Sequence, residues 1–303
     1  MRDAKWNGVF TALATPYSRN GDIEWGQLRE LIDVLLQDGV NGFVVAGSTG
    51  EYYSQSADER KELFQNVKKH VGTRATLIAG TSSLNATETL SLTAEAKSLG
   101  YDGCMILPPV YCLPTPPETK RYFEQVAEVG LPIMIYNNPA RVGVGLSAAQ
   151  TAELASIPNV VAYKESARDL YAITETYYAT RDRLAHFAGL EPYASALLSR
   201  GASGIVSTIS NLAAREVVNY YKAFRANDAD ALARNQQVID QLYHLLARSG
   251  LSSFAFVKTA MSTVGRPGGV TRAPHLMGSD EQAKQIGEAI VQIYARAGVP
   301  LQR

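Results

Sequence analysis

Short runs of apolar residues alternate along the chain with longer segments in which apolar residues recur every three or four positions. The eight short runs are almost continuous in hydrophobicity, which is typical of parallel strands buried on both faces of a sheet. The pattern therefore predicts eight parallel strands separated by helices. The runs are Val9–Pro16, Gly42–Gly47, Thr76–Gly80, Cys104–Pro108, Ile133–Asn137, Val160–Lys164, Ala185–Gly189 and Gly204–Ser207.

The segments between the runs have the spacing of amphipathic helices. Leu28, Leu31 and Leu35, for example, fall on one face of a helix. Eight strand–helix units in about 225 residues match the size of a closed barrel. An open, doubly wound sheet is the alternative, but it normally carries a glycine-rich nucleotide-binding turn after its first strand, and Thr15-Pro16-Tyr17 stands there. We therefore predict an α/β fold, a (β/α)₈ TIM barrel.

The chain after the eighth run has helical spacing to its end. An apolar stripe runs through residues 238–246, and a final helix is expected over Glu281–Ala297. The glycine-rich segment Gly265–Gly269 is interpreted as a loop and not as a domain boundary. We predict that residues 1–225 form the barrel with the active site, and that residues 226–303 form a C-terminal helical extension packed on it.

Composition narrows the class of protein. Lys and Arg together number 29, as do Asp and Glu, so there is no net charge to attract nucleic acid or an anionic membrane. Cys104 and Cys112 do not suggest a disulfide framework. We see neither a secretory signal peptide nor an apolar stretch long enough to span a bilayer. We expect a cytoplasmic protein that acts on small molecules.

Lys164 is the most unusual residue in the pattern, because it ends an apolar strand. Lysine is rarely buried unless it is paired or used in chemistry. A salt bridge to Glu165 at the barrel rim is the simple structural explanation. The functional explanation is that an apolar barrel mouth disfavours the ammonium form and supplies the free amine that an imine-forming nucleophile requires.

Other reactive residues follow other strands, at the end of the barrel where enzymes of this fold carry their active sites. Ser48 and Thr49 follow the second run, Tyr111 the fourth, and Tyr136 and Arg141 belong to the fifth run and its loop. Each alone is explained by a turn, by packing or by solvation. Together with the lysine they favour amine catalysis, with phenols and hydroxyls relaying protons and a guanidinium gripping a carboxylate.

Metal chemistry is not expected, because the four histidines are scattered and form no cluster of metal ligands. A glycine-rich phosphate loop after the last strands is also missing from the pattern. We therefore predict neither a metal nor another cofactor. The histidines are His70, His186, His244 and His275.

Several motifs together resemble the dihydrodipicolinate synthase/N-acetylneuraminate lyase family of class I aldolases. The resemblance runs from about Gly8 to Asn211 and more loosely through the C-terminal helices. It implies a Schiff-base-forming lyase that acts on pyruvate or a similar 2-oxo acid, with an aldehyde as the second substrate. The motifs are Gly47-Ser-Thr-Gly-Glu51, Tyr136-Asn-x-Pro139, Lys164, and Gly204-Ile-Val-Ser207 with Asn211.

The resemblance also implies roles for individual residues. Lys164 matches the lysine that forms the imine, and Tyr136 matches the tyrosine that shuttles protons. Ser48 matches the hydroxyl that links this tyrosine to a second one, which is Tyr111 here. Thr49 matches the residue that binds the pyruvate carboxylate.

Three further implications concern the second substrate and the assembly. Arg141 matches an arginine that receives the carboxylate of the second substrate in the synthase branch. Val206 matches a position whose backbone lies against the keto acid. In many members the second tyrosine is donated to the neighbouring subunit, so that a dimer is the minimal active unit. The resemblance implies a homotetramer built from two such dimers.

The branch of the family is less clearly indicated. Arg141 favours a 4-hydroxy-tetrahydrodipicolinate synthase, which joins pyruvate to aspartate semialdehyde. Ser48, Val142 and the pair Tyr52 and Tyr53 depart from the pattern of such synthases. A catabolic member is therefore the alternative: an aldolase for 2-keto-3-deoxy sugar acids or 4-hydroxy-2-oxoglutarate, or a dehydratase or deaminase of a 2-oxo acid. A non-catalytic keto-acid sensor is a remote alternative.

Regulation is expected to differ from that of many synthases. Asn85 is retained at the lysine feedback site, but Thr89 stands where an acidic residue is typical, and Val110 replaces an aromatic residue. We expect that lysine does not inhibit the protein.

Overall fold

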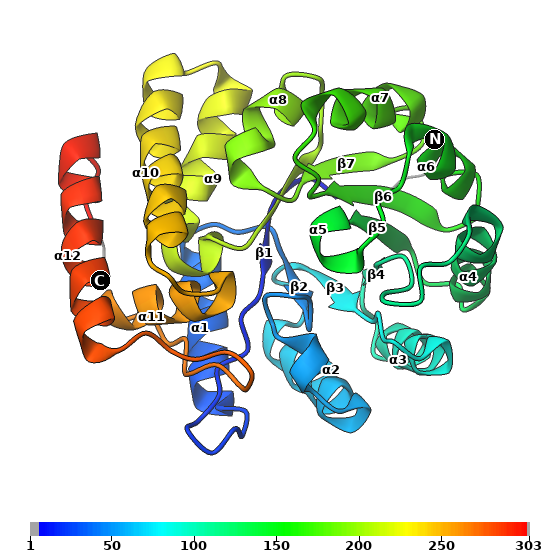
Figure 1. Cartoon of the computed structure of the whole chain (residues 1–303), viewed down its shortest axis with the longest axis horizontal. Coiled ribbons are helices and arrows are strands. Elements are labelled where there is room, and N and C mark those ends of the chain that lie inside the picture. The colour runs from blue at the N-terminus through cyan, green and yellow to red at the C-terminus, as the bar shows by residue number, and fades with distance from the viewer. Residues whose placement is uncertain (1–5, 302–303) are drawn as a thin grey trace.

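Eight parallel strands form a closed barrel in the computed structural model, which describes residues 6–301 (Figure 1). Each strand pairs with the next along the chain, and β8 closes the barrel on β1. The predicted (β/α)₈ TIM barrel is therefore confirmed. The strands are β1 Gly8–Ala12, β2 Gly42–Val45, β3 Thr76–Gly80, β4 Gly103–Ile106, β5 Ile133–Asn137, β6 Val160–Glu165, β7 Ala185–Ala188 and β8 Gly204–Ser207.

Helices connect the strands and surround the barrel, as the alternation of apolar runs and helical segments in the sequence predicts. The final helix begins one residue before its predicted start and ends where predicted. The helices, including two short 3₁₀ helices η1 and η2, are α1 Trp25–Gln37, η1 Tyr52–Ser54, α2 Ala57–Val71, α3 Ala86–Ser98, α4 Pro116–Glu128, α5 Pro139–Val142, α6 Ala148–Leu154, α7 Leu170–Thr180, η2 Glu191–Tyr193, α8 Ala194–Leu198, α9 Ser210–Ala226, α10 Ala229–Arg248, α11 Ser253–Thr263 and α12 Asp280–Ala297.

The first strand is shorter than its apolar run predicted. It ends at Ala12, although the chain stays buried as far as Tyr17. Tyr17 leaves the barrel and forms isolated bridges with Ile23 and Val270, so that a C-terminal segment covers it. Hydrophobicity continues past the strand because burial continues, while strand pairing does not.

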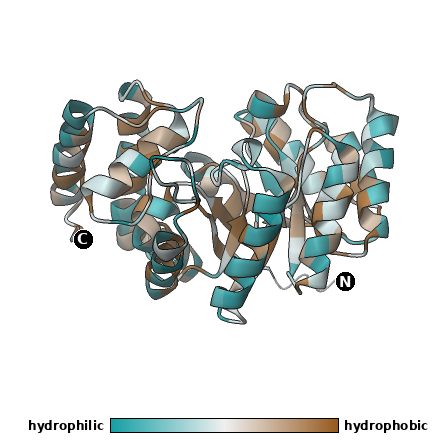
Figure 2. Cartoon of the chain, turned by 90° about the horizontal axis from the view of Figure 1, so that it is seen from below, coloured by the Kyte–Doolittle hydropathy of each residue, from teal (hydrophilic) through white to brown (hydrophobic). Residues whose placement is uncertain are grey.

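The barrel interior and the layer outside it are packed by alternate residues of each strand. Met134 and Tyr136 of β5 belong to the interior cluster, and Ile135 between them belongs to the outer one. On β6, Ala162 faces the interior and Tyr163 faces outward. The same alternation directs Lys164 inward at the carboxyl end of the strand. Figure 2 shows the hydrophobic strands enclosed by helices with more polar outer faces.

The C-terminal helices gather on one side of the barrel (Figure 1). Helix α10 packs on α9 and α12, and α11 also packs on both of these helices. Gly265–Gly269 is a loop between α11 and α12, as predicted. Within residues 6–301, no helix combines the length and apolar character needed to cross a membrane. The position of α10 and α11 matters because both helices contribute to the cavity at the barrel mouth.

Candidate active site

Lys164 and Tyr136 meet inside the carboxyl end of the barrel. They are paired in the β5–β6 ladder, so both side chains point to the interior from neighbouring strands. Lys164 Nζ lies 4.1 Å from the centroid of the Tyr136 ring. Both residues are buried, with relative exposures of 3% and 5%. The structure therefore brings an amine and a phenol together beneath the mouth of the barrel.

Glu165 points the other way and does not pair with Lys164. Its carboxylate accepts hydrogen bonds from Tyr163 Oη at 3.0 Å, Asn137 Nδ2 at 3.0 Å and Ala167 N at 2.7 Å. Burial raises the pKa of Glu165, although these hydrogen bonds oppose the shift. The rim salt bridge considered for Lys164 is thus not formed, because alternation along β6 puts the two side chains on opposite faces.

The Tyr136 phenol is held in a polar environment at the cavity. Asn138 Nδ2 donates a hydrogen bond to Tyr136 Oη at 2.8 Å. Burial raises the pKa of Tyr136, but the charge of Lys164, Asn138, the nearby Ser166 hydroxyl and Arg141 together bring it below its ordinary value of 10.0. Ser166 Oγ lies close enough to act on the phenol, yet within residues 6–301 it makes no hydrogen bond of acceptable geometry. A phenol in this setting is suited to proton transfer.

Gly189 leaves the space that Lys164 occupies. A Cβ atom at this position would lie 2.9 Å from Lys164 Cε, 2.1 Å from Ser166 Oγ and 2.7 Å from the carbonyl oxygen of Glu165. Real Cβ atoms do not approach neighbours so closely. A side chain here would displace the end of β6, so glycine is required by close packing around the lysine.

Hydroxyl groups from two loops meet at the same cavity. Thr49 is buried, Ser48 is half-buried, and both come from the loop after β2. Thr49 Oγ1 lies 3.0 Å from Oγ1 of Thr208, which follows β8. This pair of hydroxyls, together with Ser48, can donate hydrogen bonds to an anionic oxygen of a ligand.

A buried ion pair anchors the loop that carries Ser48 and Thr49. Glu51 ends this loop in the left-handed conformation, with φ 60°, and is fully buried. Its Oε1 lies 2.6 Å from Nζ of Lys258 on α11, which also donates to the carbonyl oxygen of Thr15 at 2.7 Å. Burial lowers the pKa of Lys258 to about 8, while Glu51 opposes that shift. Helix α11 is thereby fixed to the β2 loop.

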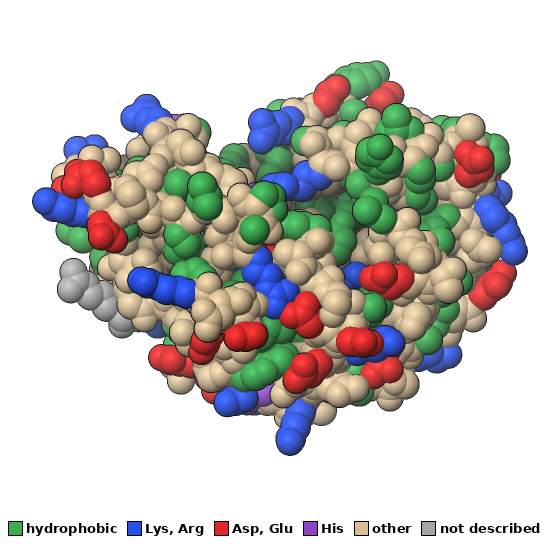
Figure 3. Space-filling view, turned by 60° about the horizontal axis from the view of Figure 1, so that its bottom comes forward, with side chains coloured by type: hydrophobic (Ala, Val, Ile, Leu, Met, Phe, Trp, Pro, Cys, Tyr) green, Lys and Arg blue, Asp and Glu red, His purple; other side chains and the backbone are tan. Residues whose placement is uncertain are grey.

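A cavity of about 610 Å³ opens beside these groups. Figure 3 shows the molecule hollowed between the C-terminal helices and the barrel, with Lys or Arg side chains at the edge. The barrel and its loops contribute polar groups, whereas α10 and α11 contribute a mostly apolar wall. The lining includes Ser48, Thr49, Tyr136, Asn138, Arg141, Ser166, Arg168 and Thr208 from the barrel, and Tyr243, Leu246, Leu251, Phe254 and Val257 from the extension.

Arg141 and Val206 lie at different depths. Arg141 lines the cavity from α5, is exposed, and its Cζ lies 4.6 Å from the centroid of the Phe254 ring. Val206 is fully buried in β8 and packs in the interior cluster with Tyr136. Tyr52 lines a small hollow with Ser48 and Tyr136, so this departure from the synthase pattern does border the site.

Tyr111 is not brought to the cavity by the fold of a single chain. Of the other predicted site residues, Lys164 and Val206 lie buried in the barrel, and four line the cavity: Ser48, Thr49, Tyr136 and Arg141. Tyr111 follows β4, has a positive φ of 75°, and its side chain is 88% exposed. Exposure of this extent gives a tyrosine little packing energy within its own chain.

Sequence reasoning missed several residues of the site. Ser166 and Thr208 stand just beyond the ends of β6 and β8, so attention to two further residues after each strand would have found them. Asn138 is the variable position of the Tyr136-Asn-x-Pro139 motif. Tyr243 and Phe254 had no signal, because they reach the cavity from helices α10 and α11, which follow the barrel.

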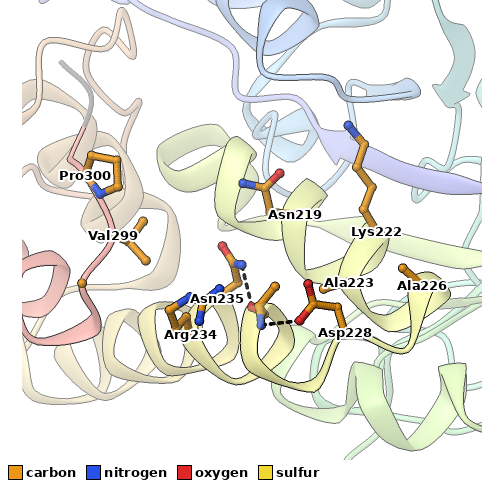
Figure 4. Close-up of a pocket in the computed structure, with 11 residues that line it drawn as sticks. Asn219, Lys222, Ala223, Ala226, Asp228, Arg234, Asn235, Val299 and Pro300 are labelled. Carbon is orange, nitrogen blue, oxygen red and sulfur yellow. Dashed lines mark hydrogen bonds between the residues drawn. The ribbon is translucent and has the colours of Figure 1, made fainter.

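A second hollow, of about 450 Å³, lies between the end of α9, the start of α10 and the segment after α12 (Figure 4). Two of its polar side chains form hydrogen bonds with α10 itself. Asp228 Oδ1 accepts from Ala231 N at 2.9 Å, and Asn235 Nδ2 donates to Ala231 O at 2.7 Å. It contains none of the site residues described above, so the mouth of the barrel is the candidate active site.

Comparison with known proteins agrees with this geometry. Residues 5–293 match the model of the dihydrodipicolinate synthetase family. An uncharacterized DapA-like lyase of Rhizobium meliloti is 45% identical over 94% of this chain and 95% of its own length. A 4-hydroxy-tetrahydrodipicolinate synthase of Moorella thermoacetica is 32% identical over 94% of this chain and 98% of its own.

Solved structures give the same result. The crystal structure of YagE from E. coli K12, a prophage protein of the dihydrodipicolinic acid synthase family in complex with pyruvate, matches with a TM-score of 0.91 and 27% identity. The match covers 96% of this chain and 99% of YagE. The chain therefore belongs to the dihydrodipicolinate synthetase family and is a lyase.

Proposed function

We propose that this lyase needs no metal and forms an imine between Lys164 Nζ and the 2-carbonyl carbon of pyruvate or a related 2-oxo acid. The observation that carries the proposal is the buried amine of Lys164, 4.1 Å from the centroid of the Tyr136 ring beside the cavity. Support also comes from YagE, a family member whose structure holds pyruvate. A purely binding protein would need neither the amine nor the phenol.

The proposed chemistry starts with attack of the neutral Lys164 amine on the carbonyl carbon, which gives a carbinolamine. Tyr136 supplies a proton to the departing oxygen, which leaves as water, and the protonated imine remains. This imine withdraws electrons, so the adjacent carbon loses a proton and becomes an enamine. The enamine carbon attacks an aldehyde, whose oxygen takes up a proton, and water then releases the product and restores the amine. Cleavage is the reverse sequence.

We assign the carboxylate of the 2-oxo acid to the hydroxyl groups of the cavity. Thr49, hydrogen-bonded to Thr208, is the binding residue, and Ser48 links Tyr136 to a second phenol in the proton relay. The backbone of Val206 is proposed to lie against the bound acid. These groups would fix the carbonyl carbon for attack, and such positioning contributes a large part of the rate of two-substrate reactions.

We propose that the second phenol, Tyr111, enters the site of a neighbouring subunit within a cytoplasmic homotetramer. The supporting observation is its 88% exposure at the end of β4, on a chain whose other proposed catalytic residues share one cavity. A dimer is then the smallest active unit.

The proposed second substrate is aspartate semialdehyde, which would make the protein a 4-hydroxy-tetrahydrodipicolinate synthase. Arg141 at the cavity supports this assignment, since a guanidinium binds a carboxylate through two parallel hydrogen bonds. Tyr52 beside Ser48 and Tyr136 supports the alternative, a catabolic 2-oxo acid aldolase or dehydratase, because it changes the shape of the site. Assays of both reactions decide between them.

Insensitivity to lysine is also proposed. Thr89, at the position where an acidic residue is typical, is buried, and its hydroxyl accepts from Ser83 N at 3.0 Å and Tyr122 Oη at 3.2 Å. A neutral hydroxyl that already accepts two hydrogen bonds cannot attract an ammonium group as a carboxylate does. Clear inhibition of the synthase reaction by excess lysine would contradict this proposal.

Incubation with pyruvate, reduction with borohydride and peptide mass spectrometry test the imine directly. We expect an adduct on Lys164 that is lost in Lys164→Ala. An adduct with a longer 2-oxo acid but not with pyruvate would favour the catabolic alternative. If no keto acid labels Lys164, the catalytic proposal is wrong and a keto-acid sensor becomes the better hypothesis.

A further inference from the structure

Two arginines line the active-site cavity without a polar partner of their own. Arg141 follows β5 and Arg168 follows β6, and both border the cavity. Within residues 6–301 neither guanidinium takes part in a hydrogen bond or an ion pair. Arg272, by contrast, is paired with Glu59, with 3.1 Å between Nη1 and Oε2. Each free guanidinium offers five N–H donors to whatever enters the cavity.

Negative charge that could balance these arginines is absent from the described lining of the cavity, which contains neither Asp nor Glu. The nearby buried carboxylates Glu51, Glu165 and Glu191 are already used, and Glu51 pairs with Lys258. Glu165 accepts hydrogen bonds outside the barrel interior, and Glu191 accepts from Ile209 N at 3.1 Å and from the hydroxyls of Ser207 and Tyr243. Both arginines are exposed at the cavity, and their positive potential favours an anionic ligand there.

The position of Arg141 also favours an anionic ligand. Its guanidinium lies over the ring of Phe254, with Cζ 4.6 Å from the ring centroid. This contact with an aromatic ring leaves the N–H donors of Arg141 without a hydrogen-bond acceptor within residues 6–301. An arginine held in this way loses less side-chain entropy when it binds a planar carboxylate.

One carboxylate of the substrate is already assigned to the hydroxyls of Thr49 and Thr208 near Lys164. The arginines therefore serve a second anionic group, farther along the substrate. The carbon chain between the two groups would pass the apolar wall that α10 and α11 supply through residues such as Leu246 and Val257. This arrangement suits a substrate that is charged at both ends and apolar between them.

We propose that Arg168 acts with Arg141 as a clamp for the distal carboxylate of the second substrate. The proposal rests on the Lys164 imine and adds Arg168 as a specificity-determining residue. Neutral hydroxylated aldehydes are disfavoured by this assignment, because they cannot satisfy either guanidinium.

A matched pair of 2-oxo acids tests the clamp. 2-Oxopentanedioate and 2-oxopentanoate have the same chain length, but only the first has a distal carboxylate. For each acid we measure the concentration of that acid at which borohydride trapping at Lys164 is half-maximal. The quantity compared between variants is the value for 2-oxopentanoate divided by the value for 2-oxopentanedioate. The variants are wild type, Arg168→Gln, Arg141→Gln and the control Arg181→Gln. Arg181 is an exposed arginine after α7 that does not line the cavity.

We expect wild type and Arg181→Gln to favour the dicarboxylate by about tenfold or more, as charge-assisted hydrogen bonds do. Arg168→Gln should reduce that ratio several-fold, and Arg141→Gln should reduce it as well. Equal trapping of the two acids by wild type, or an unchanged ratio in Arg168→Gln, would overturn the clamp. Pyruvate trapping in parallel separates the two proposals. If wild type forms no adduct with pyruvate, the imine itself is overturned. If it traps pyruvate but does not prefer the dicarboxylate, only the clamp is overturned.

Discussion

Tyr136 and Lys164 are register partners in the β5–β6 ladder, and the lysine amine lies against the phenol ring rather than against a carboxylate. This relationship follows from strand alternation. Two neighbouring strands each direct the side chain of their next-to-last residue inward, and Glu165, the last residue of β6, is directed outward. The amine is thus buried beside a phenol that can donate a proton.

Tyr136→Phe tests the phenol while it keeps the ring that packs against the lysine. We expect imine formation to slow by about a hundredfold or more, the usual contribution of a positioned acid or base. The rate of borohydride trapping with pyruvate measures the rate of imine formation. Tyr163→Phe is the matched control, because that phenol points outward to Glu165, and its loss should lower stability rather than trapping rate. Equal trapping rates in wild type and Tyr136→Phe would exclude the proposed role.

Gly189→Ala tests the space around the lysine. The added methyl would lie 2.9 Å from Lys164 Cε and 2.1 Å from Ser166 Oγ, so both side chains must move. We expect trapping to fall at least tenfold, with a stability loss of about 1–3 kcal/mol, which is typical of overpacking. Gly26→Ala is the control, since a Cβ atom at Gly26 on α1 meets nothing within 4 Å. Trapping of the Gly189→Ala variant at the wild-type rate would show that the contact is easily relieved.

The barrel was predictable because each strand is buried on both faces and therefore stands out as an apolar run. Lys164 and Tyr136 were predictable for a related reason: polar residues at the end of such a run are conspicuous. The error in β1 has the same physical origin, since Leu13 and Tyr17 are as buried as strand residues although they lie beyond the strand, and Tyr17 is bridged to Val270 of the C-terminal segment.

The remaining features depend on three-dimensional proximity, which no local pattern encodes. The ion pair between Glu51 and Lys258 joins residues from opposite ends of the chain, and Phe254 reaches Arg141 in the same way. Their helices have ordinary amphipathic spacing, so nothing in the sequence distinguishes a side chain that lines the cavity from one that only packs.

His186 on β7 should contribute to loss of stability in acid. Burial lowers its pKa from 6.5 to about 4, and its Nε2 lies 2.9 Å from Thr180 Oγ1. Between these two pKa values the unfolded chain binds more protons than the folded one, so stability falls as pH drops from 6.5 towards 4. The loss is on the order of 3 kcal/mol for this shift. Urea unfolding at pH 7 and at pH 4 measures the loss of stability in acid, which should be smaller for His186→Gln than for wild type. An equal loss would mean that the histidine takes up its proton equally in the folded and unfolded states.

Complementation between inactive chains tests whether Tyr111 serves a neighbouring subunit. Lys164→Ala lacks the amine, and Tyr111→Phe lacks the phenol, so each protein alone should have little activity. In a mixed dimer, one site combines Lys164 from the second chain with Tyr111 from the first and is complete. Random mixing after unfolding and refolding should restore about a quarter of wild-type activity, because half of the dimers are mixed and each has one intact site. If Tyr111 acted within its own chain, no mixed site would be complete, and the mixture would only average the two parents.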